Sequence, residues 1–578
     1  MAAARLRDLR EDADQLGLLS RHFFERLFRN DFVDFEDQMK ARLIAVLAIL
    51  AVVVGWSSQM LVFFKYELSP DAGTSWQEKN YIFILMMLLF GVVTLLDWEA
   101  LFPDRRDFVN LTPLPVRLRT VFAAKLVSFL AFIGLFSAAM NSLSSVVFAL
   151  FLAQWRSNSL AFVGWHVLAH LASAFAACFC VFFACVFVNF FLMALLPASL
   201  YRRASALVRF VLIGFCLFLL LSFLVEPGNM SGALRSLPRL KDHGSPLVGR
   251  VPSMWFVGLY EVLLGTSDPV FKDLARTAVQ ALGLSLGAFG LACGLSYLKH
   301  FRRTLEASKR RPHARRLREG AAGLVEAIYL RSPEARAVGG FFSRTVRSSP
   351  RHRAVIVNGL AVGAALATLA VVANRRNLQA LSPSNAYFLA QSLLLVFVLL
   401  GALRAAADQP AALESNWIFR LTETPRRDRY AAGLKNTVLV RWCLPLAALL
   451  FAGHWGLWRD ARAAALHALF CLALAALGTE LFFFRYPKIP FACTRVPGKL
   501  QLQTRAVPYV VGILGLLAAL AGFEKALLAR PRSFWIFVAA AAALWAVLRR
   551  VNARFLRDHA LVFVEEPEPA MIGFPEDA

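Results

Sequence analysis

The chain has 578 residues, of which 58% are hydrophobic, and its 63 Lys and Arg outnumber its 38 Asp and Glu to give a formal net charge of +25. A soluble globular protein does not combine this apolar content with this basic excess, so that class is excluded. Many apolar runs reach the roughly 20 residues that a helix needs to cross a bilayer. The sequence therefore predicts an all-α, polytopic membrane protein with about 12 transmembrane helices, arranged in two six-helix repeats.

Residues 1–40 precede the first apolar run and are predicted to form a cytoplasmic amphipathic helix. Apolar side chains recur every three or four positions from Leu16 to Met39, and Arg21, Glu25 and Arg29 lie opposite them. A helix with Phe and Leu on one face typically lies in the membrane interface. The alternative is an ordinary helix packed on a soluble domain.

The first predicted membrane half covers residues 41–297. Its six spans are expected at 43–64, 80–97, 121–153, 160–197, 207–225 and 276–297. Before the sixth span, residues 251–265 are apolar and aromatic but too short to cross the bilayer. Such a segment is usually re-entrant or interfacial, and the alternative is a small external cap helix.

A basic segment separates this half from the second one. Residues 299–318 hold nine Lys or Arg and one Glu, so we expect 298–352 to be a cytoplasmic linker near anionic lipid headgroups. Nucleic acid is a poor match because no aromatic platform is interleaved with the charges. The second membrane half covers 353–550. The six spans of this half are expected at 353–373, 386–404, 438–455, 462–484, 508–524 and 533–549. Residues 551–578 are expected to form a cytoplasmic tail.

The charge distribution predicts the orientation. Lys and Arg gather in alternate loops, as the positive-inside rule requires of cytoplasmic loops. An even number of spans then places both termini in the cytoplasm. We expect a multi-pass protein of the cell membrane, specifically the bacterial cytoplasmic (inner) membrane.

One loop motif occurs twice, between the second and third span of each half. The first copy reads Leu-Thr-Pro-Leu-Pro-Val-Arg-Leu-Arg from Leu111, and the second reads Leu-Thr-Glu-Thr-Pro-Arg-Arg-Asp-Arg from Leu421. The offset is 421 − 111 = 310, and the same offset relates Lys125 to Lys435. The candidate docking residues are Thr112, Pro115, Arg117, Arg119, Thr422, Pro425, Arg427 and Arg429.

These residue types suit a docking loop. Pro115 and Pro425 favour a turn or the first residue of a helix. The arginines beyond them present planar, permanently charged donors to acidic partners or headgroups. Lys125 and Lys435 then begin the next span and are predicted to anchor it at the interface. The alternative is a plain positive-inside loop, which explains the charge but not the matched pattern.

Glu480 is the candidate intramembrane polar residue. A charge at the bilayer centre costs roughly 2.5–3.5 kcal/mol, so Glu480 is expected to face the bundle interior or to lie near its edge. It would then relay protons or contact substrate, or simply reach the interface. His166 and His170 have the spacing of a metal pair but lack a third ligand. No phosphate-binding loop, catalytic motif, metal site or cofactor is predicted.

The sequence resembles the ABC-2 type transporter permeases. The resemblance rests on the amphipathic N-terminal helix, on the loop Asp-Arg-Arg-Asp-Phe-Val-Asn-Leu-Thr-Pro-Leu-Pro-Val-Arg-Leu-Arg from Asp104, and on the apolar excursion before the sixth span. It implies that a separate ATPase subunit docks on the loop between the second and third spans. It also implies that the chain forms the transmembrane pathway of an exporter.

Typical permeases of this kind have six spans and dimerise, whereas twelve are predicted here. One chain would then supply the full pore and bind two ATPase copies. The alternative function is a 6+6 secondary transporter driven by an ion gradient. A membrane enzyme is a third class, but the sequence contains no convergent catalytic set.

Overall fold

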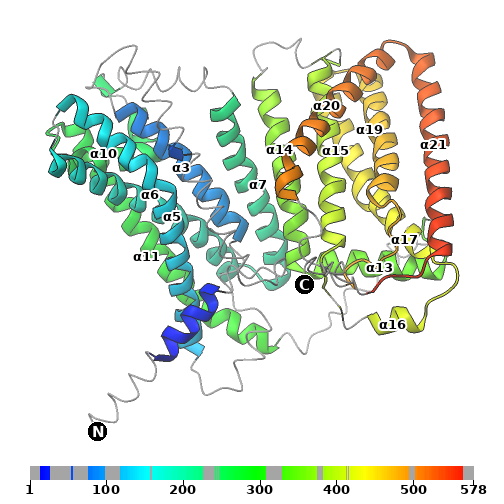
Figure 1. Cartoon of the computed structure of the whole chain (residues 1–578), viewed down its shortest axis with the longest axis horizontal. Coiled ribbons are helices and arrows are strands. Elements are labelled where there is room, and N and C mark those ends of the chain that lie inside the picture. Colours follow the sequence, from blue (N-terminus) through cyan, green and yellow to red (C-terminus); the bar gives the residue numbers. More distant parts are fainter. Residues whose placement is uncertain are drawn as a thin grey trace, which may run out of the picture. The chain divides into compact units, whose positions relative to one another are not determined.

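The computed structural model describes most of the chain. The described residues are 14–25, 54–55, 76–97, 118–156, 159–225, 241–242, 244, 246–306, 329–373, 382–383, 385–411, 413, 416–493 and 502–563. They divide into two compact units, Met1–Ser308 (unit 1) and Lys309–Ala578 (unit 2). Each unit is a bundle of long helices (Figure 1).

Unit 1 is built from long apolar helices and two short ones, α9 and α10. Its labelled helices are α3 (Trp76–Asp97), α5 (Leu118–Arg156), α6 (Leu160–Leu195), α7 (Ala198–Val225), α9 (Pro246–Gly249), α10 (Pro252–Leu263) and α11 (Pro269–Glu306). Its core is rich in Phe, and the rings of Phe129 and Phe182 stack with centroids 5.6 Å apart. Because lipid is as apolar as these side chains, close packing rather than release from water selects such contacts.

The segment predicted to be re-entrant or a cap forms α10. This helix packs against α3, α6 and α11, and it buries Met254, Phe256 and Tyr260 completely. A Cβ added at Gly258 would lie 2.5 Å from the Cβ of Leu274, so the close approach of α10 to α11 requires glycine there. α10 is therefore an integral part of the core of unit 1.

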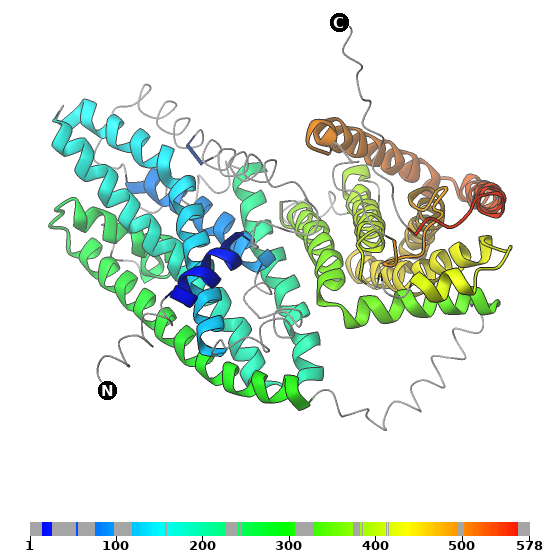
Figure 2. The ribbon, with the colours of Figure 1, turned by 60° about the horizontal axis from the view of Figure 1, so that its bottom comes forward.

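Unit 2 combines long bundle helices with short helices at one end. Its helices are α13 (Pro333–Ser348), α14 (Pro350–Ala373), α15 (Ala386–Ala407), α16 (Asn416–Leu421), α17 (Asp428–Val438), α18 (Leu444–Trp458), α19 (Ala461–Phe482), α20 (Leu502–Leu528) and α21 (Pro531–Asp558). Figures 1 and 2 show α13 running across the ends of the long helices. α13 was not predicted, because it lies inside the segment interpreted as a linker.

A π-helical turn, η4 (Leu439–Cys443), joins α17 to α18 without a break. Pro445 lacks an N–H and would clash with the carbonyl four residues earlier in a regular helix, and a π turn accommodates that irregularity. The whole stretch Asp428–Trp458 forms one candidate span of 31 residues. The span is thus longer than the predicted 438–455, and it includes Lys435.

Ten helices in the described part of the chain are long and apolar enough to cross a membrane. They fall on ten of the twelve predicted spans, and the chain is an all-α, multi-pass membrane protein. Of the two remaining predictions, 508–524 lies within α20. Apart from residues 54 and 55, the span predicted at 43–64 lies outside the described residues.

Candidate functional site

The second copy of the repeated motif connects α16 to α17 as a fixed turn. The hydroxyl of Tyr430 donates to the carbonyl of Thr422 at 2.9 Å, and the hydroxyl of Thr422 donates to the carbonyl of Ile418 at 2.7 Å. Arg427 Nε donates to Glu423 Oε1 at 2.5 Å across the turn. The turn is therefore closed by its own residues, and the guanidinium of Arg427 is already paired.

Arg429 ties the turn to α13. Its guanidinium lies 3.3 Å from a carboxylate oxygen of Glu334 in the first turn of α13. The pKa of Glu334 is held below its usual value by a hydrogen bond to its own backbone, by the Ser332 hydroxyl and by Arg429. These contacts favour the ionised carboxylate, so the pair remains charged at neutral pH.

Glycine allows α13 and α17 to pack at backbone distance. A Cβ added at Gly433 would lie 2.4 Å from the carbonyl oxygen of Ala335, and one added at Gly339 would lie 2.5 Å from the Thr437 hydroxyl oxygen. A side chain at Gly433 would require the backbone of α13 to shift, and one at Gly339 would require at least the Thr437 side chain to move. α13 is thus clamped to α17 at Gly433 and Thr437.

The outer surface beside this turn is apolar and basic. On α16, Trp417, Ile418 and Leu421 have exposed fractions of 64%, 44% and 77%. Pro425 and Arg426 of the turn are exposed as well. We call these five residues the α16 surface. Its apolar part was not predicted, although Asn-Trp-Ile-Phe-Arg-Leu stands directly before the motif in the sequence.

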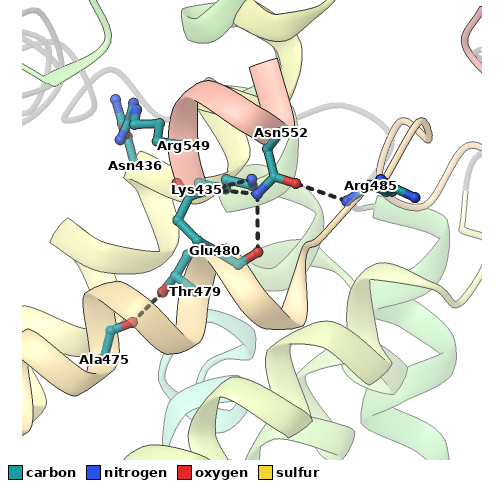
Figure 3. Close-up of polar contacts among 8 residues, drawn as sticks. All are labelled: Lys435, Asn436, Ala475, Thr479, Glu480, Arg485, Arg549 and Asn552. Carbon is teal, nitrogen blue, oxygen red and sulfur yellow. Dashed lines mark hydrogen bonds and ion pairs between the residues drawn. The ribbon is translucent and has the colours of Figure 1, made fainter. Parts of the chain in front are cut away.

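Behind the turn, α17 carries one half of a buried ion pair (Figure 3). Lys435 Nζ donates to Glu480 Oε2 at 2.5 Å, with side chains 4% and 0% exposed. Asn552 of α21 donates from Nδ2 to the same carboxylate oxygen at 2.8 Å. Glu480 Oε1 is buried and has no hydrogen-bond partner among the described residues. The prediction that Lys435 anchors the span at the interface is therefore wrong for its side chain, which turns inward.

Further polar contacts extend the pair (Figure 3). Asn552 Oδ1 accepts from the backbone N–H of Arg485 at 3.0 Å. One residue beyond Lys435, Asn436 Oδ1 accepts from Arg549 at 2.8 Å. Residues of α17, α19 and α21 are thus joined by a set of buried and half-buried polar contacts. A displacement of α17 would have to break it or move all three helices.

The first copy of the motif is described only in part. Thr112, Pro115 and Arg117 lie outside the described residues, and Arg119 falls in the first turn of α5 with its side chain outside the description. Lys125 Nζ lies 5.0 Å from the ring centroid of Phe23, which packs against the start of α5. Lys125 thus makes a cation–π contact with the N-terminal segment.

The two histidines with metal-like spacing form local contacts. Nδ1 of His166 lies 2.8 Å from the carbonyl of Phe162, and Nε2 of His170 lies 3.3 Å from the Ser144 hydroxyl. Across the described ranges, no group of three or more His, Cys, Asp or Glu is placed to hold a metal ion. The polar network around Lys435 is consequently the best-defined candidate site.

Comparison with known proteins provides no relative for this chain. The function is therefore proposed from the contacts within unit 2. Searches with protein-family models, with curated proteins and with solved structures found no match to this chain.

Proposed function

We propose that this chain is the membrane subunit of an ABC-2 type transporter, which exports its substrate with energy from a separate ATPase docked on the α16 surface. The observation that carries the proposal is the exposure of Trp417, Ile418 and Leu421 beside a turn held in one conformation. Exposed large apolar side chains that cluster mark interaction sites more often than scattered ones do. An aromatic anchor with an adjacent arginine is the composition of an interface hot spot.

The charges beside this surface specify the partner's chemistry. Arg427 and Arg429 are paired inside the chain, so Arg426 supplies the exposed charge of the turn. An apolar groove with an acidic rim on the ATPase would complement the surface. This assignment moves the docking role from the predicted Thr422, Arg427 and Arg429 to their neighbours, and those three residues hold the turn in shape.

The same geometry suggests how docking acts on the membrane helices. From Asp428 to Trp458 the helix is continuous over 31 residues, which at 1.5 Å per residue is about 46 Å. Movement of the partner would shift α16 and the clamped start of α17. The network of Lys435, Glu480 and Asn552 would pass that shift to α19 and α21. ATP hydrolysis would then drive alternating access without any catalytic residue in this chain.

The test is to extract the tagged chain gently from its native membrane and identify co-purifying proteins. We expect a stoichiometric partner with a phosphate-binding loop, at two copies per chain if both loops dock. Trp417→Ala combined with Leu421→Ala should weaken its binding roughly 30-fold or more, because hot-spot truncations cost about 2 kcal/mol or more. Trp455→Ala is the matched control, since that side chain is 52% exposed on α18.

Two results would contradict the proposal. Undiminished partner binding by the double variant would remove the docking role from the α16 surface. A monodisperse chain without any ATPase, together with uptake into vesicles driven by an ion gradient alone, would establish the 6+6 secondary transporter instead. Charge reversal at Arg117 and Arg426 together tests whether both loop copies take part.

A further inference from the structure

A second buried polar cluster lies in unit 2, remote from Lys435. It consists of His454 on α18, His467 and Cys471 on α19, and Glu524 on α20, all buried. Along the continuous helix, His454 follows Lys435 by 454 − 435 = 19 residues, or about 28 Å. The cluster thus belongs to the opposite end of the bundle from the α16 surface.

The centre of this cluster is a contact between an imidazole and a carboxylate. His467 Nδ1 lies 2.5 Å from Glu524 Oε1, and both side chains are 0% exposed. Glu524 Oε2 is buried without a hydrogen-bond partner among the described residues. The other ring nitrogen of His467, Nε2, lies 3.8 Å from Cys471 Sγ. No cation from the described residues is bonded to this carboxylate.

His454 adds a second imidazole in contact with the first. The two ring centroids are 4.5 Å apart. Nδ1 of His454 lies 2.7 Å from the Leu450 carbonyl, which can only accept, so this nitrogen carries a hydrogen. Its Nε2 then accepts from the Ser392 hydroxyl at 3.3 Å. Both ring nitrogens of His454 therefore have hydrogen-bond partners when the imidazole is neutral.

The number of protons on the His467–Glu524 pair determines its net charge. With one proton, the His467–Glu524 pair is neutral overall, either as two neutral groups or as an ion pair. Without that proton, the carboxylate would be buried with only the N–H of the neutral His467 imidazole to stabilise it, so this state is reached only at high pH. With two protons, a net positive charge would lie against the ring of His454. The geometry thus favours a pair that binds and releases a single proton.

Other groups that face the pair do not change this count. The ring centroid of Trp458 lies 5.5 Å from that of His467, and Ser392 of α15 bonds His454; both residues are uncharged. Nearby charged residues along the chain are all exposed: Arg459, Asp460, Arg462, Lys525, Arg530 and Arg532. The exposed charges at the start of α19 are close along the helix, because His467 is only six residues, about 9 Å, beyond that start.

We propose that His467 and Glu524 form a proton-binding site that exchanges one proton with the solution at the α18–α19 turn. An ionisable residue buried within membrane helices marks a proton or ion pathway by default, and here it comes with a partner that can share the proton. This site lies apart from the α16 surface, and its occupancy requires no ATPase.

Proton uptake by the purified full chain tests the proposal. In detergent, the pH is lowered from about 9 to about 5, above the range in which exposed carboxyls titrate, and the protons bound are counted. Glu524→Gln should take up one proton fewer per chain, because an imidazole buried without a counter-charge remains neutral. His467→Gln should lose the same single proton, because Glu524, without the imidazole N–H that stabilises its carboxylate, remains protonated throughout. The double variant should also lose only one.

Glu423→Gln is the matched control and should equal the wild type, since that acid lies in the turn at the surface and pairs with Arg427. Unchanged uptake in both variants would overturn the proposal, as would a loss of two protons in the double variant. If a variant fails to fold, the protonation of the buried carboxyl group is followed in the wild type by infrared difference spectra over the same pH step. Unchanged carboxyl bands there would also overturn the site.

Discussion

Removal of one partner of the Lys435–Glu480 pair should destabilise unit 2 severely. The carboxylate is fully buried and the ammonium nearly so, with Nζ and Oε2 2.5 Å apart, and solvent cannot screen a charge left alone there. Loss of one member of a buried pair costs about 3–5 kcal/mol. We therefore expect Glu480→Gln and Lys435→Met each to lower the free energy of unfolding by that amount.

Replacing both partners should restore most of this loss. Exchanging a whole buried pair for apolar side chains of similar volume is often neutral or stabilising by about 1–4 kcal/mol. In Lys435→Met with Glu480→Leu, Asn552 Nδ2 keeps the backbone carbonyl of residue 480 as an acceptor at 3.2 Å. The double variant should therefore be several kcal/mol more stable than the sum of the two single losses implies.

Unfolding by SDS titration in mixed micelles, followed by circular dichroism, measures these free energies. The control is Glu423→Gln, which removes an i,i+4 pair whose side chains are 26% and 24% exposed; it should cost less than about 1 kcal/mol. A double variant as unstable as the sum of its single losses would refute the reasoning, because the losses would then come from packing and not from an unpaired charge.

Two further predictions concern the clamp between α13 and α17. Gly433→Ala should lower the free energy of unfolding by about 1–3 kcal/mol, because its Cβ would meet the Ala335 carbonyl. Gly453→Ala is the control, since no atom lies near its added Cβ, and it should be neutral or stabilise by up to about 1 kcal/mol. Equal changes in the unfolding temperature of the two variants would contradict this prediction. Glu334→Gln should cost up to about 1 kcal/mol near neutral pH. Because the folded pKa of Glu334 is lowered, its pairing with Arg429 stabilises above the unfolded value of about 4.3 and is lost as the pH falls through the folded value. The difference in unfolding free energy from wild type should shrink below about pH 4, and a constant difference would exclude the pair as its source.

Hydropathy was sufficient to predict the long helices, because a run of apolar residues in lipid has few alternatives to a helix. It could not place their ends. The span expected at 438–455 begins at Asp428, since residues 428–437 include polar side chains that tertiary contacts bury. Likewise the span predicted at 508–524 ended on Glu524, which hydropathy treats as a boundary and the structure buries at 0% exposure.

The partners of the buried polar residues could not be predicted from the sequence. Lys435 and Glu480 are 45 residues apart on two helices, and Glu524 lies 57 residues beyond His467. No periodicity within one helix fixes the rotation of its neighbour, so neither pair is readable from spacing. Lys435 appeared as an interface anchor because hydropathy assigns a lysine at the start of a span to the headgroups. A buried acid on another helix overrides that assignment.

The two polar sites of unit 2 are linked by one helical hairpin. α18 and α19 are joined by Arg459, in the left-handed conformation, and Asp460, whose side chain caps α19. Lys435 and His454 lie on one arm, while Glu480 and His467 lie on the other, so both contacts depend on how the two arms sit against each other. A shift of α17 that lengthens the Lys435–Glu480 contact would tilt α18 against α19 and change the 4.5 Å contact between the two imidazoles. Protonation at one end and docking at the other would thus act on the same relative movement.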